Sequence, residues 1–146
     1  MSDTEKSVSR ILETYASAVY ARNVTTFMHL YDPSVRVFDA WGVWSYEGSE
    51  SWQRAVEGWF SSLGKERVKV KFSEVQTASA GPIVTLSAVV SYVAVSEQGD
   101  EIRTMENRIT WVLKTIGHVL RIVHEHTSAP IGFEDMKAIL SRQVST

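Results

Sequence analysis

Two histidines near the end of the chain have a spacing that could support chemistry on a strand. His124 and His126 stand two residues apart, and residues two apart on a strand point to the same side of a sheet. A metal site would need at least one more protein ligand, and only His29 and Asp39 could converge on the pair. We therefore expect no metal and no cofactor. The histidines are interpreted as hydrogen-bonded within the fold or, for His124, as a general base.

Large aromatic side chains are the second group of candidate site residues. The chain has five Trp, five Tyr and five Phe among 146 residues. For Trp52, Trp59 and Trp111, packing in the core is the default interpretation, and contact with a bound ligand is the alternative. Both interpretations require a sheet or a helix face against which the rings can lie.

Composition limits the architecture that can position these residues. A chain of 146 residues with 44% hydrophobic residues predicts one domain over 1–146 with a substantial core. Fifteen basic against seventeen acidic residues give a net charge of −2, which argues against nucleic acid as a partner. No stretch is long and apolar enough for a membrane span, and the N-terminus lacks the features of a secretory signal, so we expect no membrane contact and a cytoplasmic location. The absence of Cys excludes disulfides and thiolate chemistry.

Helical patterns occupy the first part of the chain. Ser2 and Glu5 suit a capping box that opens an amphipathic helix reaching about Asn23. A short helix over 25–30 and a strand over 35–39 follow. Gly48 and Ser49 then open a third helix with one apolar face, formed by Trp52, Val56, Trp59, Phe60 and Leu63.

Alternating patterns dominate from residue 68 onward. The sequence predicts strands over 68–77, 83–96, 102–114 and 118–128, separated by short turns that make them antiparallel neighbours. Strands this long must twist and bend. We therefore predict an α+β cone, in which a strongly curved antiparallel sheet packs against the N-terminal helices. The core covers about 2–130, and 131–146 is a tail in which 133–143 forms a terminal helix or docks loosely.

The lengths of the turns predict which side chains face inward. A two-residue turn at Gly117 places Asn107 and Trp111 on one face with His124 and His126. The turn at 98–100 leaves two alternatives for the strand over 83–96. A three-residue loop brings Ser87 and Ser91 to that face, whereas a two- or four-residue loop brings Leu86, Val90 and Tyr92 there.

The order of elements resembles a known family. Three segments carry the resemblance: Tyr31 to Asp39, Tyr46-Glu47-Gly48 with the helix that follows, and the closing His124-Glu125-His126-Thr127-Ser128-Ala129-Pro130. They resemble the nuclear transport factor 2-like superfamily, its SnoaL-like branch, and the association domain of calcium/calmodulin-dependent protein kinase II. The resemblance implies an α+β cone, commonly a homodimer, with a pocket between sheet and helices. The family includes isomerases, cyclases, dehydratases and proteins without catalysis, so the fold alone assigns no reaction.

Ketosteroid isomerases, which share this fold, imply roles for two residues. Asp39 resembles their general-base aspartate at the end of the first strand, and Tyr15 falls where their first helix carries the oxyanion-hole tyrosine. A carboxylate in a dry pocket and a hydroxyl donor would together support proton abstraction next to a carbonyl. The chain departs from these enzymes by having Ala40 after Asp39 and no aspartate near Asn107.

The kinase association domain implies a different pocket chemistry. Its pocket arginines align with Trp111, Ser91 and Thr127 of this chain, which predicts an aromatic, neutral pocket for a flat apolar or weakly polar ligand. Arg108 could restore one charge if the strand register slips.

These observations predict a small-molecule-binding SnoaL-like protein whose ligand is unassigned. An isomerase, cyclase or dehydratase that uses Asp39 or His124 as base, with Tyr15 as donor, is the first alternative, and an oligomerisation module like the kinase domain is the second. The ligand pocket is predicted from Trp52, Trp59, Ser91, Asn107, Arg108, Trp111 and His126. The strand over 83–96 carries little charge on either face, which predicts a homodimer through the sheet.

Overall fold

Three helices precede or interrupt the sheet in the computed structural model, which describes residues 2–142. They are α1 (Asp3–Ala21), α2 (Val24–Met28) and α3 (Ser49–Ser62). At the start of α1, the Glu5 backbone N–H donates to the Ser2 hydroxyl, which itself donates to the Glu5 carboxylate, so the predicted cap is present. None of the helices in the described part of the chain has the length and apolar composition to cross a bilayer.

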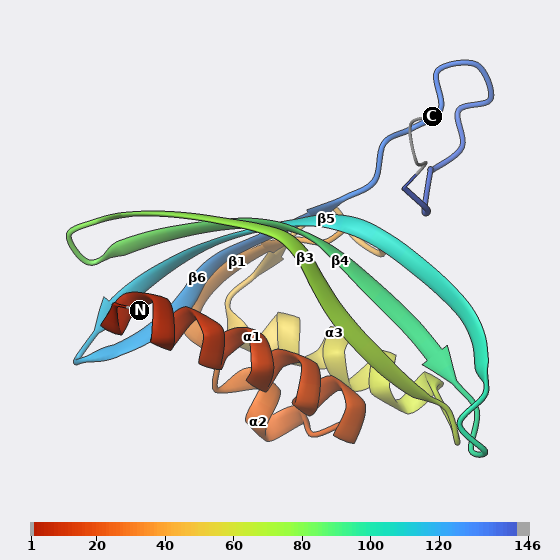
Figure 1. Ribbon diagram of the computed structural model, residues 1–146, viewed down its shortest axis with the longest axis horizontal. Coiled ribbons are helices and arrows are strands. Elements are labelled where there is room, and N and C mark those ends of the chain that lie inside the picture. The colour runs from red at the N-terminus through yellow and green to blue at the C-terminus, as the bar shows by residue number, and fades with distance from the viewer. Residues whose placement is uncertain (1, 143–146) are drawn as a thin grey trace.

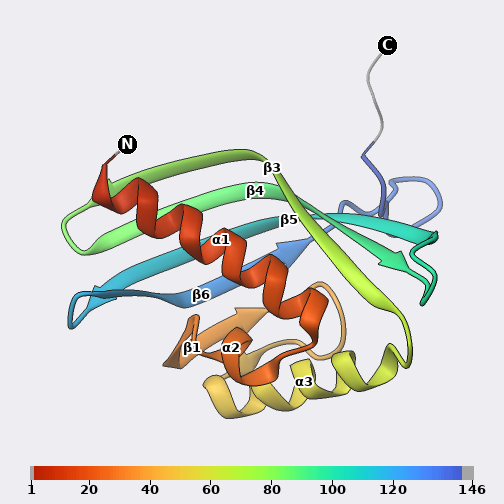
Figure 2. The same ribbon diagram turned by 60° about the horizontal axis from the view of Figure 1, so that its bottom comes forward.

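Six strands form one curved, unclosed sheet in the order β2-β1-β6-β5-β4-β3. Their bounds are β1 (Tyr31–Phe38), β2 (Tyr46–Glu47), β3 (Arg67–Ala80), β4 (Ile83–Val95), β5 (Glu101–Ile116) and β6 (Val119–Ser128). β1 is parallel to β6, and the remaining neighbours are antiparallel. The helices cover the concave side of the sheet (Figures 1 and 2). The predicted α+β architecture is confirmed, although the short strand β2 was not expected.

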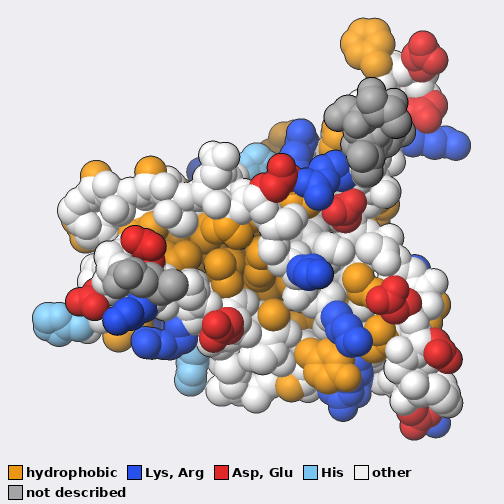
Figure 3. Space-filling model, viewed as in Figure 1, with side chains coloured by type: hydrophobic (Ala, Val, Ile, Leu, Met, Phe, Trp, Pro, Cys, Tyr) orange, Lys and Arg blue, Asp and Glu red, His pale blue; other side chains and the backbone are white. Residues whose placement is uncertain are grey.

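The hydrophobic core lies between the sheet and the helices. Figure 3 shows hydrophobic side chains gathered in the band between the sheet and α1, with charged side chains around the margins. Trp111 is fully buried there. Its ring lies 5.6 Å from that of Tyr15 and 5.7 Å from that of Phe72, measured between centroids. The core therefore joins α1, β3 and β5 through aromatic contacts.

A β-bulge in β6 reverses the predicted orientation of the two histidines. Leu113 pairs with Ile122, but Val112 pairs with His124, which leaves Val123 as an extra residue. One extra residue exchanges the two faces of a strand beyond it. The prediction that His124 and His126 share a face with Trp111 is therefore wrong.

A second irregularity determines the orientation of β4. The turn spans Ser96 to Asp100, and Val95 pairs with Glu101 while Ala94 pairs with Arg103, so that Ile102 is the extra residue. Of the two alternatives left by the sequence, the structure has Leu86, Val90 and Tyr92 on the Trp111 side. Ser91 pairs with Glu106 on the convex side.

The chain after β6 forms an irregular tail on the side of the sheet opposite the helices (Figure 1). Up to residue 142 it contains no helix, only a bridge between Ile131 and Ala138. Two contacts anchor it to Glu106: the Glu106 N–H donates to the Leu140 carbonyl at 2.7 Å, and the Arg142 N–H donates to the Glu106 carboxylate at 2.8 Å. Within the described residues the helix alternative for 133–143 is wrong, and residue 143 lies outside them.

Candidate active site and ligand pocket

A cavity of about 700 Å³ lies between the concave face of the sheet, α1, α3 and the loop after β1. This volume falls in the range of pockets that enclose organic molecules. Its wall is mainly apolar, and six aromatic residues from the helices, the strands and the loop after β1 contribute to it: Tyr15, Trp41, Tyr46, Trp52, Trp59 and Tyr92. Such a wall favours flat, apolar guests.

Glu125, on the inward face of β6, is the buried carboxyl group of the cavity. Its side chain is 1% exposed. The Tyr31 hydroxyl donates to Glu125 Oε1 at 2.6 Å, and the Trp111 indole N–H donates to the same oxygen at 2.9 Å. Both hydrogen bonds end on Oε1, which leaves Oε2 as the oxygen that a guest would meet.

The environment of Glu125 moves the titration of its carboxyl group toward neutral pH. Burial raises the pKa of Glu125 to about 7, because an ionised carboxylate loses its hydration in the protein interior. The two donors act in the opposite direction, and the nearby Asp39 raises the pKa further. A carboxyl group with a pKa close to 7 can both give and take a proton near neutral pH.

Asp39 follows β1 and reaches the cavity beside Glu125. The Thr127 hydroxyl donates to Asp39 Oδ1 at 2.9 Å and accepts from the Ala40 N–H at 2.8 Å. The Trp41 N–H donates to Asp39 Oδ2 at 3.2 Å. Burial raises the pKa of Asp39 and these donors lower it, with a net rise. Because Thr127 is two residues beyond Glu125 on the same face, the two acids are neighbours on one wall.

Two tyrosine hydroxyls meet in the wall of the cavity. The hydroxyl oxygens of Tyr15 and Tyr92 are 2.9 Å apart. Burial raises the pKa of both groups, so they remain neutral hydroxyls. One hydroxyl donates a hydrogen bond to the other, and the second hydroxyl can donate a hydrogen bond to a guest.

Two further polar atoms in the wall have no partner among the described residues. Trp52 Nε1 and Asn107 Oδ1 are buried without a hydrogen bond, and both residues line the cavity. Buried polar groups are satisfied in most proteins, but both atoms are covered by neighbouring protein atoms and do not open onto the cavity.

The structure brings together five of the predicted site residues. Tyr15, Asp39, Trp52, Trp59 and Asn107 all line the cavity. Trp111 does not line it, because it is fully buried in the core, where it supports Glu125 from behind.

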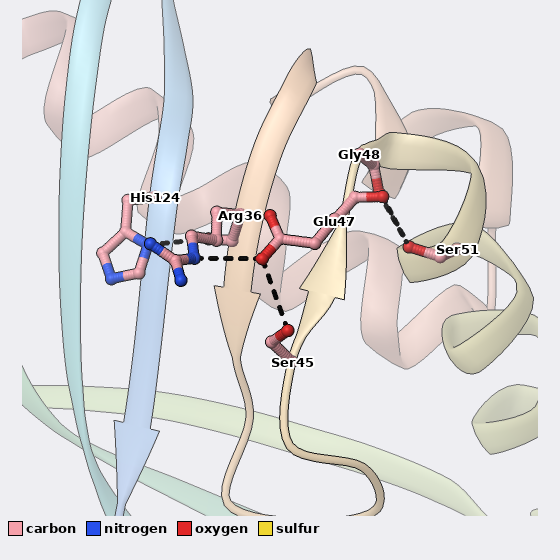
Figure 4. Close-up of polar contacts among 6 residues, drawn as sticks. All are labelled: Arg36, Ser45, Glu47, Gly48, Ser51 and His124. Atoms are coloured by element: carbon pink, nitrogen blue, oxygen red, sulfur yellow. Dashed lines mark hydrogen bonds and ion pairs between the residues drawn. The ribbon is translucent and has the colours of Figure 1, made fainter.

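The other four predicted residues lie on the convex side of the sheet. They are Ser91, Arg108, His124 and His126, each paired through the outward register of its strand. His124 Nδ1 is 2.8 Å from the Arg36 carbonyl oxygen, and Arg36 forms an ion pair with Glu47 at 3.1 Å (Figure 4). The His124 ring is therefore engaged with the β1–β2 edge, and the structure places it outside the cavity in which the base was expected.

Sequence reasoning did not identify Glu125 or Tyr46 as site residues, and it left Tyr92 as one of two alternatives for the inward face of the strand over 83–96. Glu125 lies between His124 and His126, which were predicted to face inward. Only the bulge at Val123 turns Glu125 inward in their place. No pattern in the sequence marks that bulge. Among residues 2–142, no group of three or more His, Asp or Glu side chains is arranged to hold a metal ion.

Comparisons with known proteins agree with this architecture. An NTF2-like protein of unknown function from Pseudomonas putida KT2440 has 19% identity, a TM-score of 0.85, and coverage of 97% of this chain and 96% of its own. A Xanthomonas campestris protein that carries the provisional name calcium/calmodulin dependent protein kinase II association domain has 15% identity, a TM-score of 0.71, and coverage of 84% and 85%. A protein of unknown function with a cystatin-like fold from Nostoc punctiforme has 8% identity, a TM-score of 0.70, and coverage of 88% and 92%. At these identities the likeness concerns the fold alone.

The match to a family model is more specific. No curated protein matched the chain, but the model of the SnoaL-like domain matches residues 8–132. This segment runs from α1 through the last strand and includes Tyr15, Asp39 and Glu125. The chain therefore belongs to the SnoaL-like domain family, with the α+β cone of the nuclear transport factor 2-like proteins.

Proposed function

We propose that this protein binds a small, flat organic molecule in the aromatic cavity. The observation that supports it is the convergence of six aromatic residues with Asp39 and Glu125 on one cavity of about 700 Å³. A protein that needed only a packed core would gain stability by filling such a space.

Binding of 2-acetylnaphthalene, a flat neutral ketone, tests this proposal through the intrinsic tryptophan fluorescence. We expect saturable quenching in the native protein. Ala55 lines the cavity from α3, so A55F should fill part of the space and weaken binding at least tenfold. Arg54, the exposed neighbour of Ala55 on the same helix, provides the matched control R54F, which should bind like the native protein. Equal binding by both variants would argue against the cavity as the site.

A proton-transfer enzyme is the second candidate, and the near-neutral pKa of Glu125 favours it. Glu125 Oε2 would take a proton from the carbon next to a substrate carbonyl. The Tyr15–Tyr92 hydroxyl pair would donate to the carbonyl oxygen as negative charge develops there. Return of the proton to another carbon of the enolate would complete an isomerisation, with Glu125 regenerated.

Exchange of solvent deuterium into 2-tetralone, followed by NMR, tests the proton-transfer step without knowledge of the natural substrate. E125Q should lower the catalysed exchange rate by about 10²-fold or more. H124N changes a side chain on the other face of the same strand and should keep the native rate. A native exchange rate in E125Q would show that Glu125 is not the general base. Loss of exchange in H124N alone would indicate that His124 is the base instead.

We also propose that two copies associate through the convex face of the sheet. The outward residues of β4 carry no charge, and those in the middle of the strand are half-buried even in one chain: Val89, Ser91 and Val93. β4 lies next to the edge strand β3, and an uncharged strip such as its outward face is typical of a contact with a second copy. V89E should convert a dimer to a monomer in light scattering after gel filtration, and a native protein that stays monomeric at 100 μM concentration would contradict the proposal.

A further inference from the structure

The ionisable groups around the cavity are predominantly of one sign. Asp39 and Glu125 reach it from β1 and β6, and Arg103 is the one basic residue among the described residues that line it. Arg103 is already neutralised, because its guanidinium forms a two-point ion pair with Glu66, at 2.6 Å and 3.3 Å. Its side chain is also 60% exposed, so it lies at the rim. The interior therefore offers acidic groups without a basic partner.

Aromatic rings surround these acids. The rings of Tyr46 and Trp52 are 5.3 Å apart and those of Trp59 and Tyr92 are 5.9 Å apart, measured between centroids. The face of an aromatic ring carries negative potential and attracts a cation within about 6 Å, and groups of such rings recognise quaternary ammonium ions. Anions gain nothing from such a wall.

We infer that the cavity selects an organic cation, an aromatic amine or quaternary ammonium compound, over neutral and anionic molecules of similar shape. This inference rests on the proposed function, since it assumes that the cavity binds a small molecule. The aromatic body of the ligand packs against the rings, and its charged nitrogen lies against Glu125 Oε2 and Asp39. The ligand thereby supplies the counter-charge that the protein itself lacks in the cavity.

Binding of such a cation is coupled to the release of a proton. Burial keeps part of the Glu125 population protonated near neutral pH in the empty cavity, and it also raises the pKa of Asp39. A cation beside them favours the ionised form, so the carboxyl proton leaves for solvent while the ammonium group takes its place as partner. The other titratable groups that face these acids are Tyr15, Tyr31 and Tyr92, whose pKa values are raised by burial. These tyrosines stay neutral between pH 5.5 and 7.5, so they contribute no proton to the release that accompanies binding.

Three naphthalene probes separate the charge of the ligand from its shape. They are (2-naphthylmethyl)trimethylammonium, 2-acetylnaphthalene and 2-naphthylacetate, each titrated by calorimetry at pH 7.5. We expect the quaternary ammonium ion to bind at least tenfold more tightly than the ketone, and the carboxylate at least tenfold more weakly. The charge of the quaternary ion does not depend on pH, so any pH dependence of its binding reports on the protein.

The pH dependence provides an independent measurement on the native protein. The affinity for the quaternary ammonium ion should rise at least tenfold from pH 5.5 to 7.5. At pH 6.5, the heat of binding should change with the ionisation enthalpy of the buffer in the sense of proton release. A flat pH profile with no buffer effect would overturn the role of the two acids.

Two variants and one control test the residues. E125Q and D39N should each lower the ratio of cation affinity to ketone affinity at least tenfold. E57Q makes the same change on the exposed side of α3 and should leave that ratio unchanged. If one of the two acid variants fails to fold, the other carries the test together with the pH profile.

The outcomes distinguish this inference from the proposed function. If the ketone binds as tightly as the cation, or if both acid variants keep the native ratio, the selectivity for cations is wrong and the small-molecule pocket stands. If no probe binds at millimolar concentration, both proposals are wrong.

Discussion

Glu125 and Thr127 point from β6 to the concave side of the sheet, whereas His124 and His126, their neighbours along the chain, point to the convex side. The histidine rings pack edge-on against Phe38, at 5.1 Å and 5.6 Å between centroids. Glu125 is almost completely buried among aromatic side chains. The same strand thus has one face on which histidine rings pack against Phe38 and another that carries a buried carboxyl group. The comparison teaches that burial moves the pKa of a carboxyl group toward neutrality, the range in which histidine is the usual titrating group.

The largest expected effect concerns the pH dependence of stability, tested by E125Q. The pKa of Glu125 rises from 4.5 in the unfolded reference to about 7 in the folded protein. The stabilisation from the buried neutral acid is therefore complete below pH 4.5 and is lost as the pH rises to about 7. A shift of this size corresponds to about 3 kcal/mol.

Urea unfolding of the native protein and E125Q across this range measures that loss. The free energy of unfolding of the native protein should fall relative to that of E125Q between pH 4.5 and 7, and the difference should stay constant above pH 7. If the free energies of unfolding of the native protein and E125Q changed with pH in parallel over the whole range, Glu125 would have the same pKa in the folded and unfolded states. The difference in environment between the two faces of β6 would then not be supported.

A smaller effect is expected from T127V, which removes the hydroxyl that links Asp39 to the inner face. The change deletes the donor to Asp39 Oδ1 and the acceptor for the Ala40 N–H. We expect a loss of about 1–2 kcal/mol in the free energy of unfolding, together with a further rise of the Asp39 pKa, because a hydrogen bond to the charged form is lost.

Thr110 lies opposite His126 on the convex face and is exposed, so T110V is the matched control for T127V. It should change the free energy of unfolding by less than about 0.5 kcal/mol. If T110V lowered the free energy of unfolding as much as T127V, the effect of T127V would reflect a general role of threonine in these strands and not its hydrogen bonds to Asp39 and Ala40.

The smallest effect is expected from H124A on the outer face. His124 makes one hydrogen bond, to the Arg36 carbonyl, and packs against Phe38. Its removal should cost about 1 kcal/mol or less and should leave the binding of 2-acetylnaphthalene unchanged. A loss of 2-acetylnaphthalene binding in H124A would show that the convex face of the sheet, and not the concave face, takes part in binding.

Most of the fold could be predicted from the sequence, because the periodic patterns are strong. The face formed by Trp52, Val56 and Trp59 predicts α3 and its contact with the sheet, and the period-two segments predict the four long strands β3 to β6. The inward position of Tyr15 and Asp39 came from the family resemblance, and that of Trp52 and Trp59 from the helix face.

The orientation of individual strand residues could not be predicted, because it depends on single inserted residues. Val123 and Ile102 each shift a strand by one position. Such a shift exchanges inner and outer side chains without changing the hydrophobic alternation of the segment before it. For this reason the sequence predicts His124 and His126 at the cavity in place of Glu125, and it leaves Ser91 and Tyr92 as alternatives there. Counting residues between turns is reliable only for strands without bulges.

The most direct test of the account is the titration of the Glu125 carboxyl carbon by NMR in protein labelled with carbon-13 at glutamate. Its resonance is assigned by its absence from the spectrum of E125Q. The buried inner face of β6 predicts a midpoint close to pH 7. A midpoint near 4.5, the ordinary value for glutamate, would show that Glu125 is solvated, and neither the acid–base role nor the contrast between the two faces would stand.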